Sequence, residues 1–88
     1  MKLKYDFESI DMGDEIIFVP VGDGARQVHG VLKLNAEGKE ILDLLKEKTT
    51  ENDIINVLSA KYENDRQTLV NYVRKIIHTL QEAGLIEE

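Results

Sequence analysis

The spacing of the apolar residues changes near Leu34, so that a strand-forming part precedes a helical part. Apolar and polar residues alternate weakly over residues 5–10, and a β-branched and aromatic run follows at residues 15–19. Such patterns are typical of strands, and Pro20 is expected to end the second one. Residues 27–34 form the third predicted strand, while the Gly- and Asp-containing segments 11–14 and 21–26 are predicted turns. We therefore expect three short antiparallel strands.

After Asn35 the apolar residues recur at helical spacing, which predicts three helices. Asn35 and Thr50 are suitable N-caps for the first two, because their side-chain oxygens can accept hydrogen bonds from free amides of the first turn. The third helix is expected to begin at Asn64, which with Gln67 approximates a capping box, and Gly84 is expected just beyond its end. The predicted fold is α+β: a three-stranded antiparallel β-sheet followed by three α-helices, in a winged helix-turn-helix arrangement that forms one domain, residues 1–88.

Charge and composition narrow the function classes. The 88 residues include 17 acids and 11 bases, a net charge of -6, which would repel a phosphate backbone, so a nucleic-acid partner is not expected. No apolar run approaches the roughly 20 residues of a membrane span, and the first residues lack the apolar stretch of a signal peptide. We expect a cytoplasmic protein without a membrane partner.

The residues that usually carry chemistry are few and scattered. Cysteine is absent, which excludes disulfides and thiolate ligands. His29 and His78 fall in different predicted elements, whereas a metal site needs three or four convergent donors. Asp43 and Glu47 are one helical turn apart on a face expected to be solvated. We expect no enzyme activity, no metal and no cofactor.

Two predicted elements could form a binding groove. The strand at residues 27–34 comes last in the sheet, and at an edge its free main-chain groups would be a template for another strand. The long last helix is locally basic through Arg66, Arg74 and Lys75. A groove between them would suit an extended peptide with apolar anchors and some acidic residues. The alternative is that the helix simply packs on the sheet with its basic residues solvated, and the residues alone support both equally.

Several segments, taken in order, resemble one known family. Residues 28–41 (VHGVLKLNAEGKEI) are similar to the strand-to-helix junction of the pyrroloquinoline quinone biosynthesis protein D (PqqD) family. Residues 50–54 (TENDI), Tyr62 and residues 80–86 (LQEAGLI) are similar to its later motifs. The resemblance covers about residues 14–86; residues 1–13 match no part of it and are expected to be a first strand or an arm that swaps in an oligomer.

The resemblance implies a recognition element for ribosomally synthesised, post-translationally modified peptides. Such a domain binds the leader segment of a precursor peptide by β-strand addition and presents it to a modifying enzyme, often a radical S-adenosylmethionine (SAM) protein, without doing chemistry itself. Carried over to this chain, the peptide-binding strand comprises Val28, His29, Gly30, Val31, Leu32 and Lys33. The helix wall comprises Leu69, Tyr72, Val73, Arg74, Ile76 and Ile77, of which Tyr72 and Arg74 are expected to matter most for affinity.

Two other function classes stay open. A winged-helix DNA-binding regulator would use Arg66, Arg74 and Lys75 on its recognition helix, although three bases are few on a chain of net charge -6. A structural or dimerisation subunit is the other, and a homodimer is compatible with either. The sequence does not identify the precursor peptide or the modification.

Overall fold

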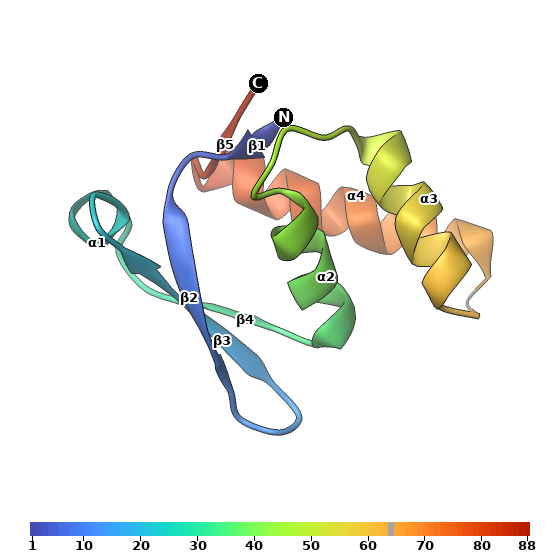
Figure 1. The fold of residues 1–88 in the computed structure, drawn as a ribbon, viewed down its shortest axis with the longest axis horizontal. Helices are drawn as coiled ribbons and strands as arrows, with labels where there is room; N and C mark the ends of the chain where they lie inside the picture. Colours follow the sequence, from blue (N-terminus) through green and yellow to red (C-terminus); the bar gives the residue numbers. More distant parts are fainter. Residues whose placement is uncertain (64) are drawn as a thin grey trace.

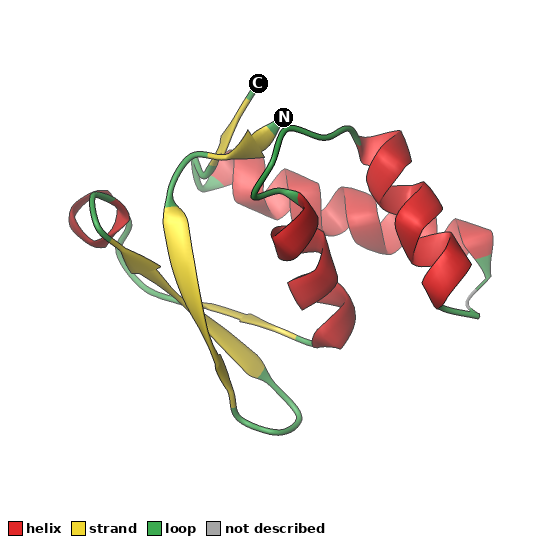
Figure 2. Cartoon of the chain, in the orientation of Figure 1, coloured by secondary structure: helices red, strands yellow, loops and turns green. Residues whose placement is uncertain are grey.

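A three-stranded antiparallel sheet lies beside a group of helices in the computed structural model, which describes residues 1–63 and 65–88 (Figures 1 and 2). The elements in chain order are β1 (Lys2–Leu3), β2 (Asp6–Asp11), β3 (Ile16–Val21), α1 (Gly24–Gln27), β4 (Leu32–Leu34), α2 (Ala36–Leu44), α3 (Glu51–Lys61), α4 (Arg66–Glu82) and β5 (Ile86–Glu87). The predicted α+β class, with a three-stranded antiparallel sheet followed by helices, is confirmed. The short elements α1 and β5 were not predicted, and the winged helix-turn-helix arrangement stays a prediction.

The order of strands in the sheet is β2-β3-β4, so β3 is central and β2 and β4 are the edges. Ile16 and Phe18 of β3 lie opposite Leu34 and Leu32 of β4. Ile16, Phe18 and Pro20 are buried, whereas the residues between them are half-buried. Because side chains alternate along a strand, one face of β3 packs into the core and the other faces away from it.

The predicted end of the second strand at Val19 is wrong, because β3 continues through Pro20 to Val21. Pro20 lies opposite Phe7 of β2, but the pairing with β4 covers only residues 16–18. At Pro20 the strand therefore has one neighbour instead of two. A proline is tolerated there because its φ angle suits extended backbone and its missing N–H is harmless on an unpaired side.

The third predicted strand, residues 27–34, is mostly wrong, since β4 contains only Leu32–Leu34. Gln27 belongs to α1, where the Val28 amide donates to the Gly24 carbonyl at 2.8 Å. Gly30 has a φ angle of 106°, a conformation that L-residues rarely adopt and that breaks an extended strand. Local helical hydrogen bonds and this glycine therefore prevent residues 27–31 from pairing with β3.

The predicted helix caps agree with the structure at all but one position. The Asn35 and Thr50 side chains accept from the amides of Gly38 and Asp53 at 2.9 and 3.1 Å. The N-cap of α4 is Asp65, whose carboxylate accepts from the Thr68 amide at 3.2 Å. Asn64, the expected start of that helix, lies outside the described residues.

The C-terminal end of α4 confirms the predicted role of Gly84. This residue has a φ angle of 72°, and the amide of Leu85 after it donates to the Leu80 carbonyl at 2.9 Å. Together with the Gly84 amide, which donates to the Gln81 carbonyl, this is a Schellman motif. It returns the chain to the core, where Leu85 is buried and β5 pairs with β1.

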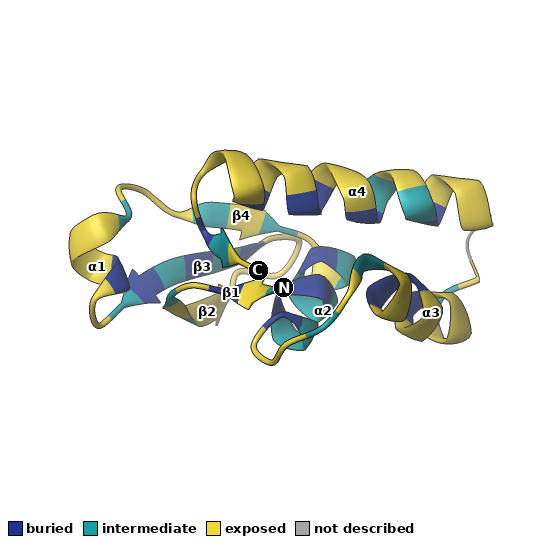
Figure 3. Cartoon of the chain, turned by 90° about the horizontal axis from the view of Figure 1, so that it is seen from above, coloured by how far each residue is buried: buried dark blue, intermediate teal, exposed yellow. Residues whose placement is uncertain are grey.

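The core lies between the sheet and the helices (Figure 3). Its fully buried side chains come mainly from the helices and from Leu85: Ile41, Leu42, Leu45, Ile54, Leu58, Leu69, Val73, Leu80 and Leu85. The segment before β3 contributes Leu3 of β1, whose amide donates to the Leu45 carbonyl at 2.8 Å. Of the two expectations for residues 1–13, a strand is therefore confirmed, and within this single chain β1 pairs with β5.

Candidate functional site

One edge of the sheet faces the last helix. β4 has β3 as its single neighbour among the described strands, so one side of its main chain has no strand partner. Figure 3 shows α4 running beside β4 on the side away from β3. Unpaired N–H and C=O groups at such an edge can accept another strand. The sequence-based expectation of an edge strand beside the last helix is therefore met, although the strand is shorter than expected.

A hollow of about 390 Å³ separates this edge from α4. Its walls are formed by Lys33 and Leu34 of β4, by Asn35, by Tyr72, Lys75 and Ile76 of α4, and by Asp14 and Glu15 of the turn between β2 and β3. Its volume falls within the range of ligand-binding clefts. The apolar parts of Leu34, Tyr72 and Ile76 lie close to the free main chain of β4, which is a combination that an extended peptide can use.

Tyr72 connects the helix wall to the strand-to-helix junction. Its hydroxyl donates to Asn35 Oδ1 at 2.7 Å, and the same oxygen accepts from the Gly38 amide. Burial raises the pKa of the Tyr72 phenol above 10.0, and the negative charge of Glu37 adds to the increase. At neutral pH the phenol is therefore a neutral hydrogen-bond donor.

Charges of both signs surround the hollow. Lys33 and Lys75 lie on the strand and helix walls, and Asp14 and Glu15 lie on the turn. Within the described residues, none of these four side chains makes a hydrogen bond or an ion pair. A bound segment therefore meets two cations and two carboxylates whose charges are not already paired in the chain.

Comparison of the chain with known proteins shows the family to which it belongs. The family described as "Coenzyme PQQ synthesis protein D (PqqD)" matches residues 17–86. The chain belongs to the PqqD family. Among solved structures it is similar to "TbiB1 in Complex with the TbiA(beta) Leader Peptide", with 26% sequence identity, a TM-score of 0.70, and coverage of 99% of this chain and 95% of that one. No curated protein matches the sequence.

The predicted helix residues of this PqqD-family chain occupy three different surroundings. Tyr72 and Ile76 line the hollow beside β4. Leu69 and Val73 are buried in the core, and Ile77 is buried as well. Arg74 lies elsewhere: its Nε is 3.5 Å from Glu51 Oε1 of α3, and both residues line a separate hollow with Ile77 and His78. The structure thus brings two of the six predicted residues to the β4 groove.

The predicted strand residues are also divided. Lys33 lines the hollow, and Leu32 is half-buried beside it in β4. Val28 follows α1 and packs against the core, whereas His29, Gly30 and Val31 are exposed in the segment that precedes β4. These four residues are therefore not part of the strand.

Five residues of the hollow were not in the predicted peptide-binding set: Asp14, Glu15, Leu34, Asn35 and Lys75. Lys75 follows Tyr72 by three positions and precedes Ile76, so helical spacing alone places it on the same face as Tyr72. Asp14 and Glu15 are brought to the site by the register of β3 and β4, in which Ile16 lies opposite Leu34. No local sequence signal gives that register, because it depends on where β4 begins.

Neither a metal-binding cluster nor a membrane-spanning helix is present in the described part of the chain. No group of three or more His, Cys, Asp or Glu side chains there could hold a metal ion. None of the helices described is long and apolar enough to cross a membrane.

Proposed function

We propose that this PqqD-family domain binds the leader segment of a ribosomally synthesised precursor peptide as an additional strand on β4, against α4. The observation that carries the proposal is the unpaired edge of β4, which faces α4 across a hollow of about 390 Å³. Family membership and the likeness to TbiB1, whose structure contains a leader peptide, support it. Strand addition gives affinity through main-chain hydrogen bonds, for which the free edge of β4 supplies the partners.

The side chains around the edge define which segment fits. Alternate residues of an added strand point to the same side, so one set would face Leu34, Tyr72 and Ile76. Apolar residues belong in that set. Acidic residues of the peptide would meet Lys33 and Lys75, and a basic residue near the turn would meet Asp14 and Glu15. The binding segment is therefore expected to have apolar residues that face Tyr72 and Ile76 and acidic residues that lie close to Lys33 and Lys75.

We further propose that the domain does no chemistry and presents the bound precursor to a modifying enzyme, a radical SAM protein in the first instance. The support for the enzyme class is the family resemblance. A direct test is to add the domain to a mixture of precursor and enzyme and to measure product formation. Activity that needs the domain, and that is lost with a precursor lacking its leader, agrees with this role, whereas equal activity without the domain contradicts it.

The structure offers little support for DNA binding through α4. Arg66 donates to Ser59 Oγ at 3.4 Å, Arg74 is paired with Glu51, and Lys75 lies in the β4 hollow. These three bases therefore do not form one surface along which a phosphate backbone could run. A salt-dependent DNA-binding assay separates the two functions.

An NMR titration of the ¹⁵N-labelled chain tests the peptide proposal. The probes are synthetic leader segments of precursor peptides encoded near the gene, with the matching core segments as controls. We expect leader-dependent shifts and slower hydrogen exchange at Leu32–Leu34, with shifts at Tyr72 and Lys75. Binding without any change at β4, or no difference between leader and core segments, would contradict the proposal.

A further inference from the structure

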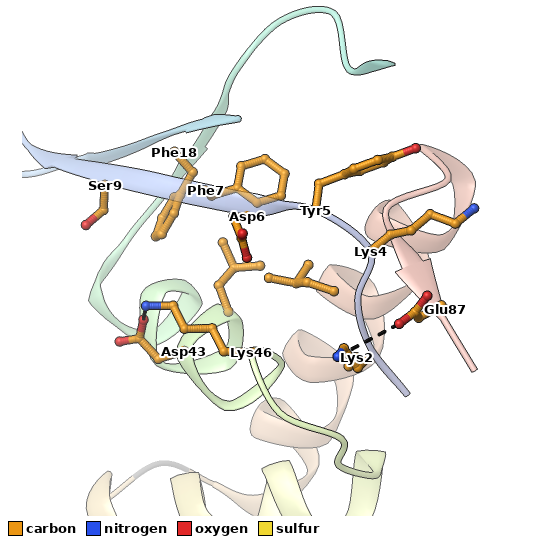
Figure 4. Close-up of a pocket in the computed structure, with 12 residues that line it drawn as sticks. Lys2, Lys4, Tyr5, Asp6, Phe7, Ser9, Phe18, Asp43, Lys46 and Glu87 are labelled. Atoms are coloured by element: carbon orange, nitrogen blue, oxygen red, sulfur yellow. Dashed lines mark ion pairs between the residues drawn. The ribbon is translucent and has the colours of Figure 1, made fainter. Parts of the chain in front are cut away.

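The other edge of the sheet carries a second groove. β2 is the outer strand opposite β4, and a hollow of about 450 Å³ lies along β1 and β2 and the end of α2. Figure 4 shows the side chains that line it: Lys2, Leu3, Lys4, Tyr5, Asp6, Phe7, Ser9, Phe18, Leu42, Asp43, Lys46 and Glu87. β2 has six residues, twice as many as β4, so it offers the longer unpaired edge.

The floor of this hollow is apolar. Leu3, Phe18 and Leu42 are buried core residues that also line it, and Phe7 is half-buried against them. An unpaired edge above an apolar floor has the features needed for strand addition: main-chain groups to pair with and a place for every second side chain. The residues before Ile17 lie outside the family match, so family membership assigns no role to β2.

Acidic residues are concentrated in the N-terminal part of the sheet, and three of them, Asp6, Glu8 and Asp11, belong to β2. Residues 5–25 contain six acids and no lysine or arginine, whereas the rest of the chain has eleven acids and eleven bases. The whole net charge of -6 therefore comes from residues 5–25, which span β2, β3 and the turn that follows β3. Within the described residues, the Asp6 and Glu8 side chains have no ion pair or hydrogen bond, and they share one face of the sheet, opposite Val21 and Val19.

The lysines at the rim do not neutralise these acids. Lys2 pairs with Glu87 at 4.0 Å, and Lys46 pairs with Asp43 at 3.4 Å. Lys4 makes no ion pair among the described residues, and in Figure 4 its side chain points away from Asp6. The acidic face of β2 is therefore free to attract a cationic partner.

We propose that the edge of β2 binds an extended segment of a partner protein in which lysine or arginine alternates with apolar residues. The basic side chains lie beside Asp6 and Glu8, and the apolar ones enter the hollow over Phe7 and Phe18. A second copy of β2 is a poor occupant, because every charged residue of the strand is acidic and like charges on paired strands repel each other. Since β2 and β4 are opposite edges, this segment and the leader peptide can be bound together.

The test uses the full chain and a short synthetic peptide in which lysine and valine alternate. We expect this peptide to shift and protect the amides of Asp6–Asp11 in ¹⁵N NMR spectra at low salt, with β4 unchanged. An alternating glutamate–valine peptide controls for the charges. The lysine–valine peptide with every second amide N-methylated keeps the charges but removes half of the main-chain donors, so it controls for strand pairing.

Charge-reversal variants complete the test. Glu8→Lys should weaken binding about tenfold, because it replaces an attraction with a repulsion, whereas Glu63→Lys, with the same change in net charge on an exposed loop, should change it less than about twofold. Equal binding of the N-methylated peptide, shifts at β4 in place of β2, equal effects of the two variants, or no binding would each overturn the proposal. Because the leader titration reports on β4 alone, this proposal can fail while the proposed function stands.

Discussion

The Tyr72 hydroxyl and the Asn35 side chain are joined by a hydrogen bond of 2.7 Å between residues 37 positions apart. Asn35 Oδ1 also caps α2 through the Gly38 amide, so one oxygen atom connects the middle of α4 to the start of α2. Asn35 directly follows β4, the proposed peptide-binding edge. This contact therefore fixes the distance between the two walls of the groove.

A double-mutant cycle measures this connection. Tyr72→Phe removes only the hydroxyl and should lower the free energy of unfolding by about 1 kcal/mol. Asn35→Ala removes both the cap and the acceptor and should cost about 1–2 kcal/mol. Because both variants break the same hydrogen bond, the double variant should lose less than the sum of the two. Denaturant unfolding gives all three values, and strictly additive losses would show that the contact contributes nothing.

The raised pKa of Tyr72 predicts that the contribution of Tyr72 to the free energy of unfolding depends on pH. In the folded chain, burial and Glu37 keep the phenol protonated to higher pH than in the unfolded chain, whose phenol titrates near 10.0. The unfolded state therefore releases this proton first, and stability falls as the pH rises above about 10. Below that pH the contribution is constant. The stability difference between the wild type and Tyr72→Phe should thus shrink only above pH 10, and a difference that shrinks between pH 6 and 9 would contradict this.

The helical half was predictable because its signals are local. Asn35 and Thr50 cap helices within three residues of themselves, and Gly84 ends α4 through hydrogen bonds that span at most five residues. The apolar residues of α4 also follow its own period, so Leu69, Val73 and Leu80 could be placed on a buried face without knowledge of the fold. The direction in which Arg74 points depends on α3, and α4 alone does not reveal it.

The sheet was less predictable because its limits depend on non-local pairing. Pro20 stays in β3 since β4 has already ended its pairing at Phe18, which no local pattern reveals. Residues 27–31 have strand-like composition, yet α1 and Gly30 remove them from the sheet. As a result, the hollow between β4 and α4 has fewer strand residues than the predicted groove, and it includes Asp14 and Glu15, which the sequence did not indicate.

At position 38 even the smallest side chain, the methyl group of alanine, should lower the stability of the fold. A Cβ atom at this position would lie 2.8 Å from Leu34 Cβ and 3.0 Å from the Tyr72 hydroxyl. Leu34 Cβ cannot yield without moving β4, and the Tyr72 hydroxyl can yield only by disturbing its hydrogen bond to Asn35. Gly38→Ala should therefore destabilise the fold by about 1–3 kcal/mol despite the better helix propensity of alanine. The control is Ala36→Gly, on the exposed side of the same helix, which creates no clash. Thermal unfolding that shows a stabilised Gly38→Ala variant would contradict the close approach.

Lys75 and Arg74 are adjacent cations with opposite surroundings, and they give a matched test of the groove. Lys75 lies in the hollow beside β4 and has no ion pair among the described residues, whereas Arg74 pairs with Glu51 on the side of α3. Lys75→Glu should therefore weaken binding of a leader segment with acidic residues by about fivefold, through loss of an attraction at the rim. Arg74→Glu changes the net charge equally and should alter affinity by less than about twofold, since exposed pairs such as Arg74–Glu51 contribute little.

Isothermal titration calorimetry of both variants with one leader peptide, at low and high salt, separates the effect of a charge inside the groove from the effect of the net charge of the chain. If the groove beside β4 is the binding site, the loss in Lys75→Glu diminishes at high salt, because screening weakens exposed charge interactions. An equal loss in both variants would mean that net charge alone attracts the peptide. A larger loss of affinity in Arg74→Glu would indicate that the peptide binds in the hollow on the α3 side, which Arg74 lines together with Ile77 and His78.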